Sequence, residues 1–180
     1  MSERRDKIQL LSRLNRGRVA VPAFLTALGE ALGTNVSPES LLSLPQTDTL
    51  AESFKIGYQQ ASESHAISFR RSFAPRQAQS FLKLIDCFAG QLTKEKDVVF
   101  LTKLSDVCGA VLVSAPTLLR HAEAVINFDG DSLSALSGDR QQGVLLDFNP
   151  DDTDHFYEVT VWGDHWAMLI IGCVDRRKDA

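Results

Sequence analysis

The chain has 180 residues, 44% of them apolar or aromatic and 23% charged, and its formal net charge at pH 7 is -4. A chain of this size and composition can bury the core of one folded domain, which excludes a largely disordered protein. No apolar run approaches the roughly 18 to 20 residues that cross a bilayer, and the start, Met-Ser-Glu-Arg-Arg-Asp-Lys, lacks the apolar stretch of a signal peptide. We therefore expect a single domain over residues 1–180 that stays in the cytoplasm, with no membrane partner.

The amino-terminal half is predicted to be mostly helical. Residues 6–14 place leucine and isoleucine at helical spacing, which indicates an amphipathic helix ending near Gly17. Pro22 suits the first turn of a second helix, because the missing N–H has no helical partner there. This second helix is expected to end at Gly33.

Two further helices, a strand and a long amphipathic helix are predicted next. Ser37 caps a short helix, and Thr47 or Asp48 begins a longer one. Residues 65–73 alternate apolar and polar side chains, the period of a strand, although a helix remains an alternative. Pro75 then opens a helix that we expect to lie across the sheet. Its apolar stripe consists of Ala78, Phe81, Leu82, Ile85, Phe88 and Ala89, before Gly90.

Beyond Lys96, runs of β-branched and aromatic residues replace the helical period. The short connections between the last runs favour antiparallel neighbours, so the chain is predicted to end in a three-stranded meander. The fold class is therefore α+β, with a helical amino-terminal half packed on a carboxy-terminal, mostly antiparallel sheet. The predicted segments are strands 98–101 and 109–113, a helix over 116–125, and strands 143–148, 156–162 and 166–174.

The three cysteines, Cys87, Cys108 and Cys173, are widely spaced within apolar stretches. An odd number at such spacing fits neither a disulfide framework nor a zinc site. Free cysteine behaves as a small apolar residue. All three are therefore expected to be reduced and buried.

Motifs that would dictate a reaction are absent. His121-Ala-Glu123 matches half of a zinc deaminase signature, but the Pro-Cys-x-x-Cys segment that completes the metal shell is missing. Asp129-Gly-Asp131 lacks the twelve-residue frame of a calcium loop, and no glycine-rich phosphate loop occurs. We expect no metal, no cofactor and no catalytic residue.

Charge is unevenly distributed along the chain. Residues 1–18 hold six Lys or Arg against two acids, whereas residues 129–164 hold nine acids against one Arg. Such carboxylates are often ordinary solvated loop residues, but gathered on one face they steer a basic protein into contact. The predicted partner-binding residues are Asp147, Asp151, Asp152, Asp154, Glu158 and Asp164 for charge, with Trp162 as an apolar anchor.

The carboxy-terminal third contains a pattern of an apolar strand and an acidic turn, followed by Tyr157-Glu158, Trp162-Gly163 and Trp166. It resembles bacterial immunity proteins, which protect cells against contact-dependent and polymorphic toxins. The resemblance implies a binding protein that inhibits a cognate toxin by covering its active site or an adjacent surface. Many such toxins are basic nucleases, so an acidic face would occupy the channel meant for a polyanion.

Two other classes of function remain open. A small hydrolase or nuclease would use His155, Asp164 and His165, provided that the three side chains meet in a cleft. A regulatory adaptor would instead contact a partner helix through the basic amino-terminal segment. Nucleic-acid binding by this segment is not expected, because charges on one helix face usually contact solvent; the residues concerned are Arg4, Arg5, Lys7, Arg13, Arg16 and Arg18.

Overall fold

The computed structural model describes residues 2–63, 68–94 and 97–175, and it confirms the α+β class. In this part of the chain, no helix combines the length and the apolar character that a membrane span requires. The helices are α1 (Ser2–Leu32), α2 (Leu44–Glu63), α3 (Ala78–Gln91), α4 (Ser105–Cys108), α5 (Ala115–Arg120), α6 (Ala122–Asp129) and α7 (Asp164–Asp175). Three 3-10 turns lie at Pro38–Ser40, Pro75–Gln77 and Leu92–Lys94.

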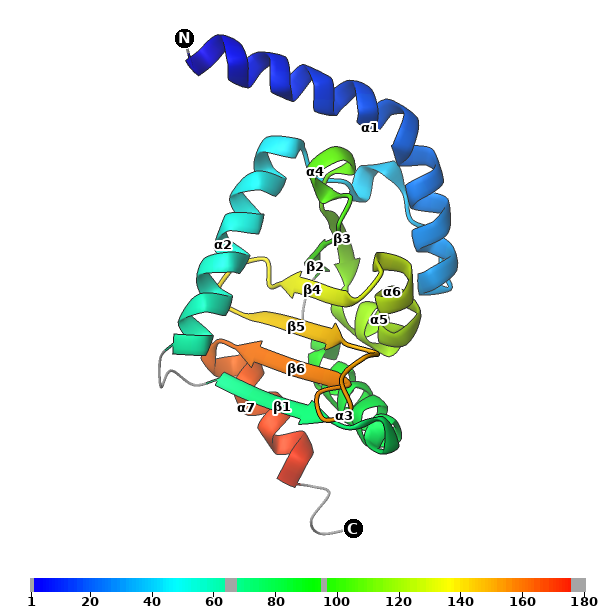
Figure 1. The fold of residues 1–180 in the computed structure, drawn as a ribbon, viewed down its shortest axis with the longest axis vertical. Helices are drawn as coiled ribbons and strands as arrows, with labels where there is room; N and C mark the ends of the chain where they lie inside the picture. Colours follow the sequence, from blue (N-terminus) through cyan, green and yellow to red (C-terminus); the bar gives the residue numbers. More distant parts are fainter. Residues whose placement is uncertain (1, 64–67, 95–96, 176–180) are drawn as a thin grey trace.

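An antiparallel sheet forms the centre of the molecule (Figure 1). Every neighbouring pair of strands runs antiparallel, in the spatial order β1-β6-β5-β4-β2-β3. The edge strand β1 therefore comes from the middle of the chain and pairs with β6 near its end. The strands are β1 (Ser68–Phe73), β2 (Asp97–Leu101), β3 (Val111–Ser114), β4 (Ser132–Leu136), β5 (Gly143–Phe148) and β6 (Tyr157–Trp162).

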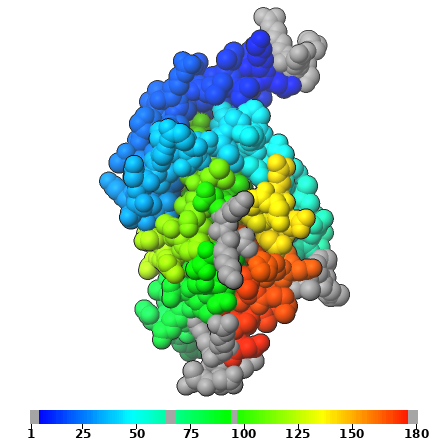
Figure 2. Space-filling view, turned by 180° about the vertical axis from the view of Figure 1, so that it is seen from behind, coloured from blue at the N-terminus to red at the C-terminus, as the bar shows by residue number. Residues whose placement is uncertain are grey.

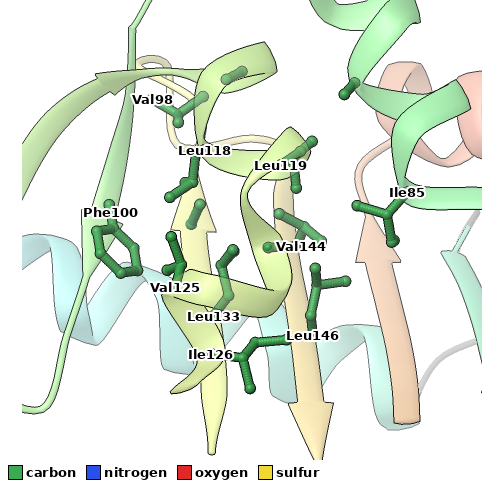
Figure 3. Packing of buried hydrophobic residues seen from close by; sticks show 14 of the residues in the cluster. Ile85, Val98, Phe100, Leu118, Leu119, Val125, Ile126, Leu133, Val144 and Leu146 are labelled. Atoms are coloured by element: carbon green, nitrogen blue, oxygen red, sulfur yellow. The ribbon is translucent and has the colours of Figure 1, made fainter. Parts of the chain in front are cut away.

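The main core lies between one face of this sheet and helices α3, α5, α6 and α7, with the second half of α1 at its edge. Leu133, Val144 and Leu146 project from β4 and β5 toward Leu118 and Ile126 of the helices (Figure 3). Side chains alternate between the two faces of a strand, so every second residue of β5 and β6 faces this core and the residues between them face the opposite side of the sheet.

Among the helices in the described part of the chain, only α2 covers the opposite face of the sheet, at one end of the strands (Figure 1). Trp162, at the end of β6, is 5% exposed and packs edge-on against Phe54 and Tyr58 of α2, with ring centroids 5.0 and 6.2 Å apart. Two glycines make room for its indole, because a Cβ on Gly143 or Gly57 would overlap the ring. Trp162 thus fixes where α2 crosses the sheet.

The two predicted amino-terminal helices are one helix, α1, of 31 residues. Gly17 does not end it but lies inside it, facing α4. A Cβ at this position would be 2.5 Å from the Val107 carbonyl oxygen, so glycine allows the two helices to approach closely. Pro22 is also internal, where its ring removes one helical hydrogen bond and crowds the preceding turn. Figure 1 shows that α1 changes direction along its length.

The predicted third strand of the meander, residues 166–174, is wrong: this segment belongs to α7. Its apolar run has no strand partner. Trp166, Ile170 and Cys173 are buried at spacings of four and three residues, which is one face of a helix. The side chain of Gln142 also accepts a hydrogen bond from the Trp166 N–H at 3.1 Å, which satisfies one unpaired donor at the start of α7.

Other boundaries differ from the predictions. Thr47 does not cap α2 but lies within it, and its hydroxyl accepts a hydrogen bond from the Ala110 N–H at 2.8 Å. The predicted helix 116–125 is two helices, α5 and α6, that meet at His121. Residues 68–73 of the predicted strand 65–73 form β1, while 65–67 lie outside the described residues.

The expectation of three reduced cysteines is also wrong. Cys87 of α3 and Cys173 of α7 form a disulfide, with Cα atoms 5.9 Å apart, and Cys108 is free and buried. The pairing escaped prediction because the odd number and wide spacing of the cysteines did not show that α3 and α7 pack together. The bond ties α7, the last helix, to the helix at the centre of the core.

A pair of glycine substitutions tests the packing at Trp162. Gly143→Ala should lower the free energy of unfolding by about 2–3 kcal/mol, because the held indole cannot move away from the new methyl group. Gly90→Ala, at an exposed helical site with no heavy atom near its Cβ, should raise it by about 0.5 kcal/mol. Urea unfolding measures both, and equal effects would contradict this packing.

The disulfide closes a loop with a sequence separation of 86 residues, and its loss should lower the free energy of unfolding by about 4 kcal/mol. Thermal unfolding with and without a dithiol reductant measures the change. The double variant Cys87→Ser/Cys173→Ser should not respond to the reductant. Alkylation of three thiols in the denatured, unreduced protein would show that the bond does not form.

Candidate functional site

The part of the sheet face that α2 leaves uncovered contains a polar hollow of about 460 Å³. Strands β1, β5 and β6 form its floor, and the loop 149–156 between β5 and β6 forms one wall. We call this site the sheet-face hollow. It is lined by Arg70, Arg71, Ser72, Asp147, Asn149, Asp152, His155 and Glu158.

Strand register gathers the floor residues into one row. Ser72 lies opposite Glu158, and Glu158 lies opposite Asp147 on its other side, so these side chains share a face. Like charges directly opposite each other destabilise a sheet. Arg70 compensates part of this cost, because its Nε donates a hydrogen bond to the Glu158 carboxylate.

Asp147 is the carboxylate that this arrangement leaves without a cation. Partial burial raises the pKa of its carboxyl group, and the negative charge of Glu158 raises it further. Within the described residues, no ion pair joins Asp147 to a Lys, Arg or His side chain, whereas the nearby Asp131 is paired with Lys103 at 3.0 Å. The hollow therefore holds an exposed, electrostatically unsatisfied carboxylate.

The loop 149–156 is ordered by its own acidic residues. The Asp152 carboxylate accepts hydrogen bonds from the backbone N–H groups of Asp154 and His155, both at 2.8 Å, and these bonds lower its pKa. Asp151 and Asp154 are exposed on the same loop. The loop thus places two further negative charges beside the hollow, while Asp152 mainly shapes it.

The predicted partner-binding residues divide into two groups. Asp147, Asp152 and Glu158 meet in the sheet-face hollow, with Asp151 and Asp154 at its border. Asp164 lies at the opposite end of β6, beside a separate hollow of about 590 Å³ between α2 and the turns 140–142 and 163–165. Trp162, predicted as the apolar anchor, is buried beneath α2 and is not available to a partner on the surface.

The sequence also missed the positive charge of the hollow. Strand β1 supplies Arg70, Arg71 and Ser72 to the lining. Arg70 lies 88 residues before Glu158, its partner in the hollow. The hollow therefore sets three carboxylates against one guanidinium, that of Arg70. Arg71 is paired in register with the core-facing Val159, and its guanidinium lies over the ring of Phe73. The alternation of residues 68–73 was visible in the sequence, but the pairing of β1 with β6 was not.

The three side chains of the hydrolase alternative do not meet. His155 lies before β6, while Asp164 and His165 follow its end, and the six residues of the strand separate them by about 17 Å. The His155 Nδ1 is 2.8 Å from the Ser72 Oγ, and its ring bonds to no carboxylate in the described part of the chain. This geometry lacks the third group that orients a catalytic base.

Among residues 2–63, 68–94 and 97–175, no cluster of three His, Cys, Asp or Glu side chains is arranged to hold a metal ion. Comparisons of the chain with protein-family models, curated proteins and solved structures find no match. The site must therefore be interpreted from its own geometry.

The opposite pKa shifts of two aspartates predict opposite responses to pH. Because the pKa of Asp147 is raised on folding, its charge opposes folding above the unfolded value of 3.8. Asp147→Asn should therefore stabilise the protein at pH 7, by less than about 1 kcal/mol given solvent screening, and the gain should vanish in acid.

Asp139 supplies the matched control. Hydrogen bonds from the Ser137 hydroxyl and the Gln141 N–H lower its pKa, so its charge stabilises the fold at pH 7 and this contribution is lost as pH falls. Asp139→Asn should destabilise the protein at neutral pH and not in acid. Urea unfolding across the acid range measures both variants, and shifts of the same sign would refute the assignment.

Proposed function

We propose that this protein is a bacterial immunity protein, which binds a cognate toxin through the sheet-face hollow and the loop 149–156. The observation that carries the proposal is the exposed Asp147 carboxylate, placed opposite Glu158 without a cation of its own. A lysine or arginine of a partner placed there relieves a repulsion that the free protein carries. Binding then gains from a contact that the isolated fold cannot make.

Charge in the loop supports the same partner chemistry. Asp151 and Asp154 are exposed, whereas the Asp152 carboxylate is held by two hydrogen bonds from the loop backbone. Negative charges at the border of a concave surface increase the association rate of a basic protein. The resemblance of residues 143–166 to immunity proteins points to a toxin as that basic protein.

A growth experiment tests the proposal. The protein encoded beside this gene is expressed alone and together with the immunity protein, and co-expression should restore growth and yield a complex of the two proteins. The variant Asp147→Lys/Asp151→Lys/Asp154→Lys should weaken the complex at least about a hundredfold, because three contacts with a basic surface become repulsive. Binding is measured by calorimetry with the purified toxin domain.

The matched control is Glu30→Lys/Glu39→Lys/Glu123→Lys, which changes the net charge equally at exposed sites away from the hollow. It should bind as the unchanged protein does. Equal loss of affinity in both variants would mean that only total charge matters. Absence of growth rescue by the unchanged protein would refute the immunity function.

A further inference from the structure

A second hollow, of about 590 Å³, lies between α2 and the turns 140–142 and 163–165. In the space-filling view, the connection between β4 and β5 that contains residue 140, in yellow, lies against α2, in cyan and turquoise (Figure 2). Sites for small molecules usually have volumes of about 300–1,000 Å³, so this hollow has the size of one. We call it the tryptophan hollow, because Trp162 lines it.

The indole N–H of Trp162 is a donor without an acceptor. Its Nε1 atom is buried and has no hydrogen-bond partner among the described residues. The atom lies against Gly57 of α2, which lines the same hollow, and a Cβ on this glycine would overlap it. An unpaired buried donor costs free energy. An acceptor that reaches this wall of the hollow therefore gains a hydrogen bond that the isolated chain lacks.

Gly57 and its neighbour Ile56 form the α2 wall of the hollow. Ile56 is 48% exposed and offers an apolar surface. Glycine is among the residues that least favour a helix interior, so α2 yields most easily at Gly57. A small displacement of the helix there brings the indole N–H into contact with the hollow. This wall thus combines an apolar contact with a hydrogen-bond donor.

Besides His165, the lining contains one cation and one anion, Arg140 and Asp164. Neither side chain forms a hydrogen bond or an ion pair with another described residue, so the two do not pair with each other. Arg140 has a backbone φ of 65°, where glycine or asparagine is usual, so the geometry of the turn does not account for an arginine. The hollow therefore presents charges of both signs to a ligand.

We propose that the tryptophan hollow binds a free α-amino acid with an apolar side chain. The carboxylate of this ligand accepts hydrogen bonds from the Arg140 guanidinium and the Trp162 indole, and its ammonium group pairs with Asp164. Its side chain covers Ile56. Among the described residues, none lines both this hollow and the sheet-face hollow, so the proposal does not depend on the immunity function.

Nuclear magnetic resonance of the ¹⁵N-labelled full-length protein tests the proposal, because each tryptophan gives one indole N–H signal. The chain has two tryptophans, so the variant Trp166→Phe assigns the remaining signal to Trp162. L-Leucine at millimolar concentration should move the Trp162 signal downfield in a saturable way, as a new hydrogen bond does. The Trp166 indole packs against Phe88 in the main core, and its signal should not move.

Two smaller probes separate the charges of the ligand. The probe 4-methylpentanoate keeps the carboxylate of leucine and lacks its ammonium group, whereas 3-methylbutylamine keeps the amine and lacks the carboxylate. Each should bind at least about tenfold more weakly than leucine, because one charge pair is lost. Binding of either probe as tight as that of leucine, or no saturable shift with leucine, overturns the proposal.

Substitutions of the two charged residues complete the test. Arg140→Gln and Asp164→Asn should each weaken leucine binding at least about tenfold. Both side chains are exposed, so circular dichroism should show an unchanged fold. The matched controls, Arg76→Gln and Asp106→Asn, change exposed residues outside the hollow, and Asp106, like Asp164, lies in the first turn of a helix. These controls should bind leucine as the unchanged protein does, and an equal loss in all four variants would refute the assignment.

Discussion

The packing of one indole ring beneath α2 determines where the sheet is covered and where it is open. Trp162 lies at the end of β6, and only the missing side chains of Gly143 and Gly57 allow α2 to approach it closely. This contact holds α2 across one end of the strands. The polar residues at the other end of the same face are therefore left to solvent, and the sheet-face hollow exists because of where α2 lies.

The hollow shows how a sheet can keep unfavourable charge within a stable fold. The main core on the opposite face fixes the strand register, and this register places Asp147 beside Glu158. Arg70 neutralises only one member of the pair. The remaining cost is small compared with the burial of the core, so the fold tolerates a site that a cationic partner would stabilise.

Local sequence predicted what depends on local patterns. Strands β2, β5 and β6 and the long stripe of α3 follow from alternation and helical period, and the acidic loop 149–156 was visible in composition. The failures involve contacts between distant segments. The capping of α7 by Gln142, the Cys87–Cys173 bond and the arrival of Arg70 beside Glu158 depend on which elements meet in the folded chain, and a single sequence does not show this.

The position of β1 at the rim of the sheet has a consequence for solubility during synthesis. An edge strand offers unpaired backbone N–H and C=O groups to any other extended chain. The two central arginines of Ser-Phe-Arg-Arg-Ser-Phe oppose aggregation through this edge. Arg71 packs over the ring of Phe73, with 5.0 Å between its guanidinium carbon and the ring centroid, and keeps a positive charge at the open rim. At the other rim, Leu41 forms an isolated bridge to Val111 of β3. Both edge strands thus oppose edge-to-edge pairing with the sheet of another molecule.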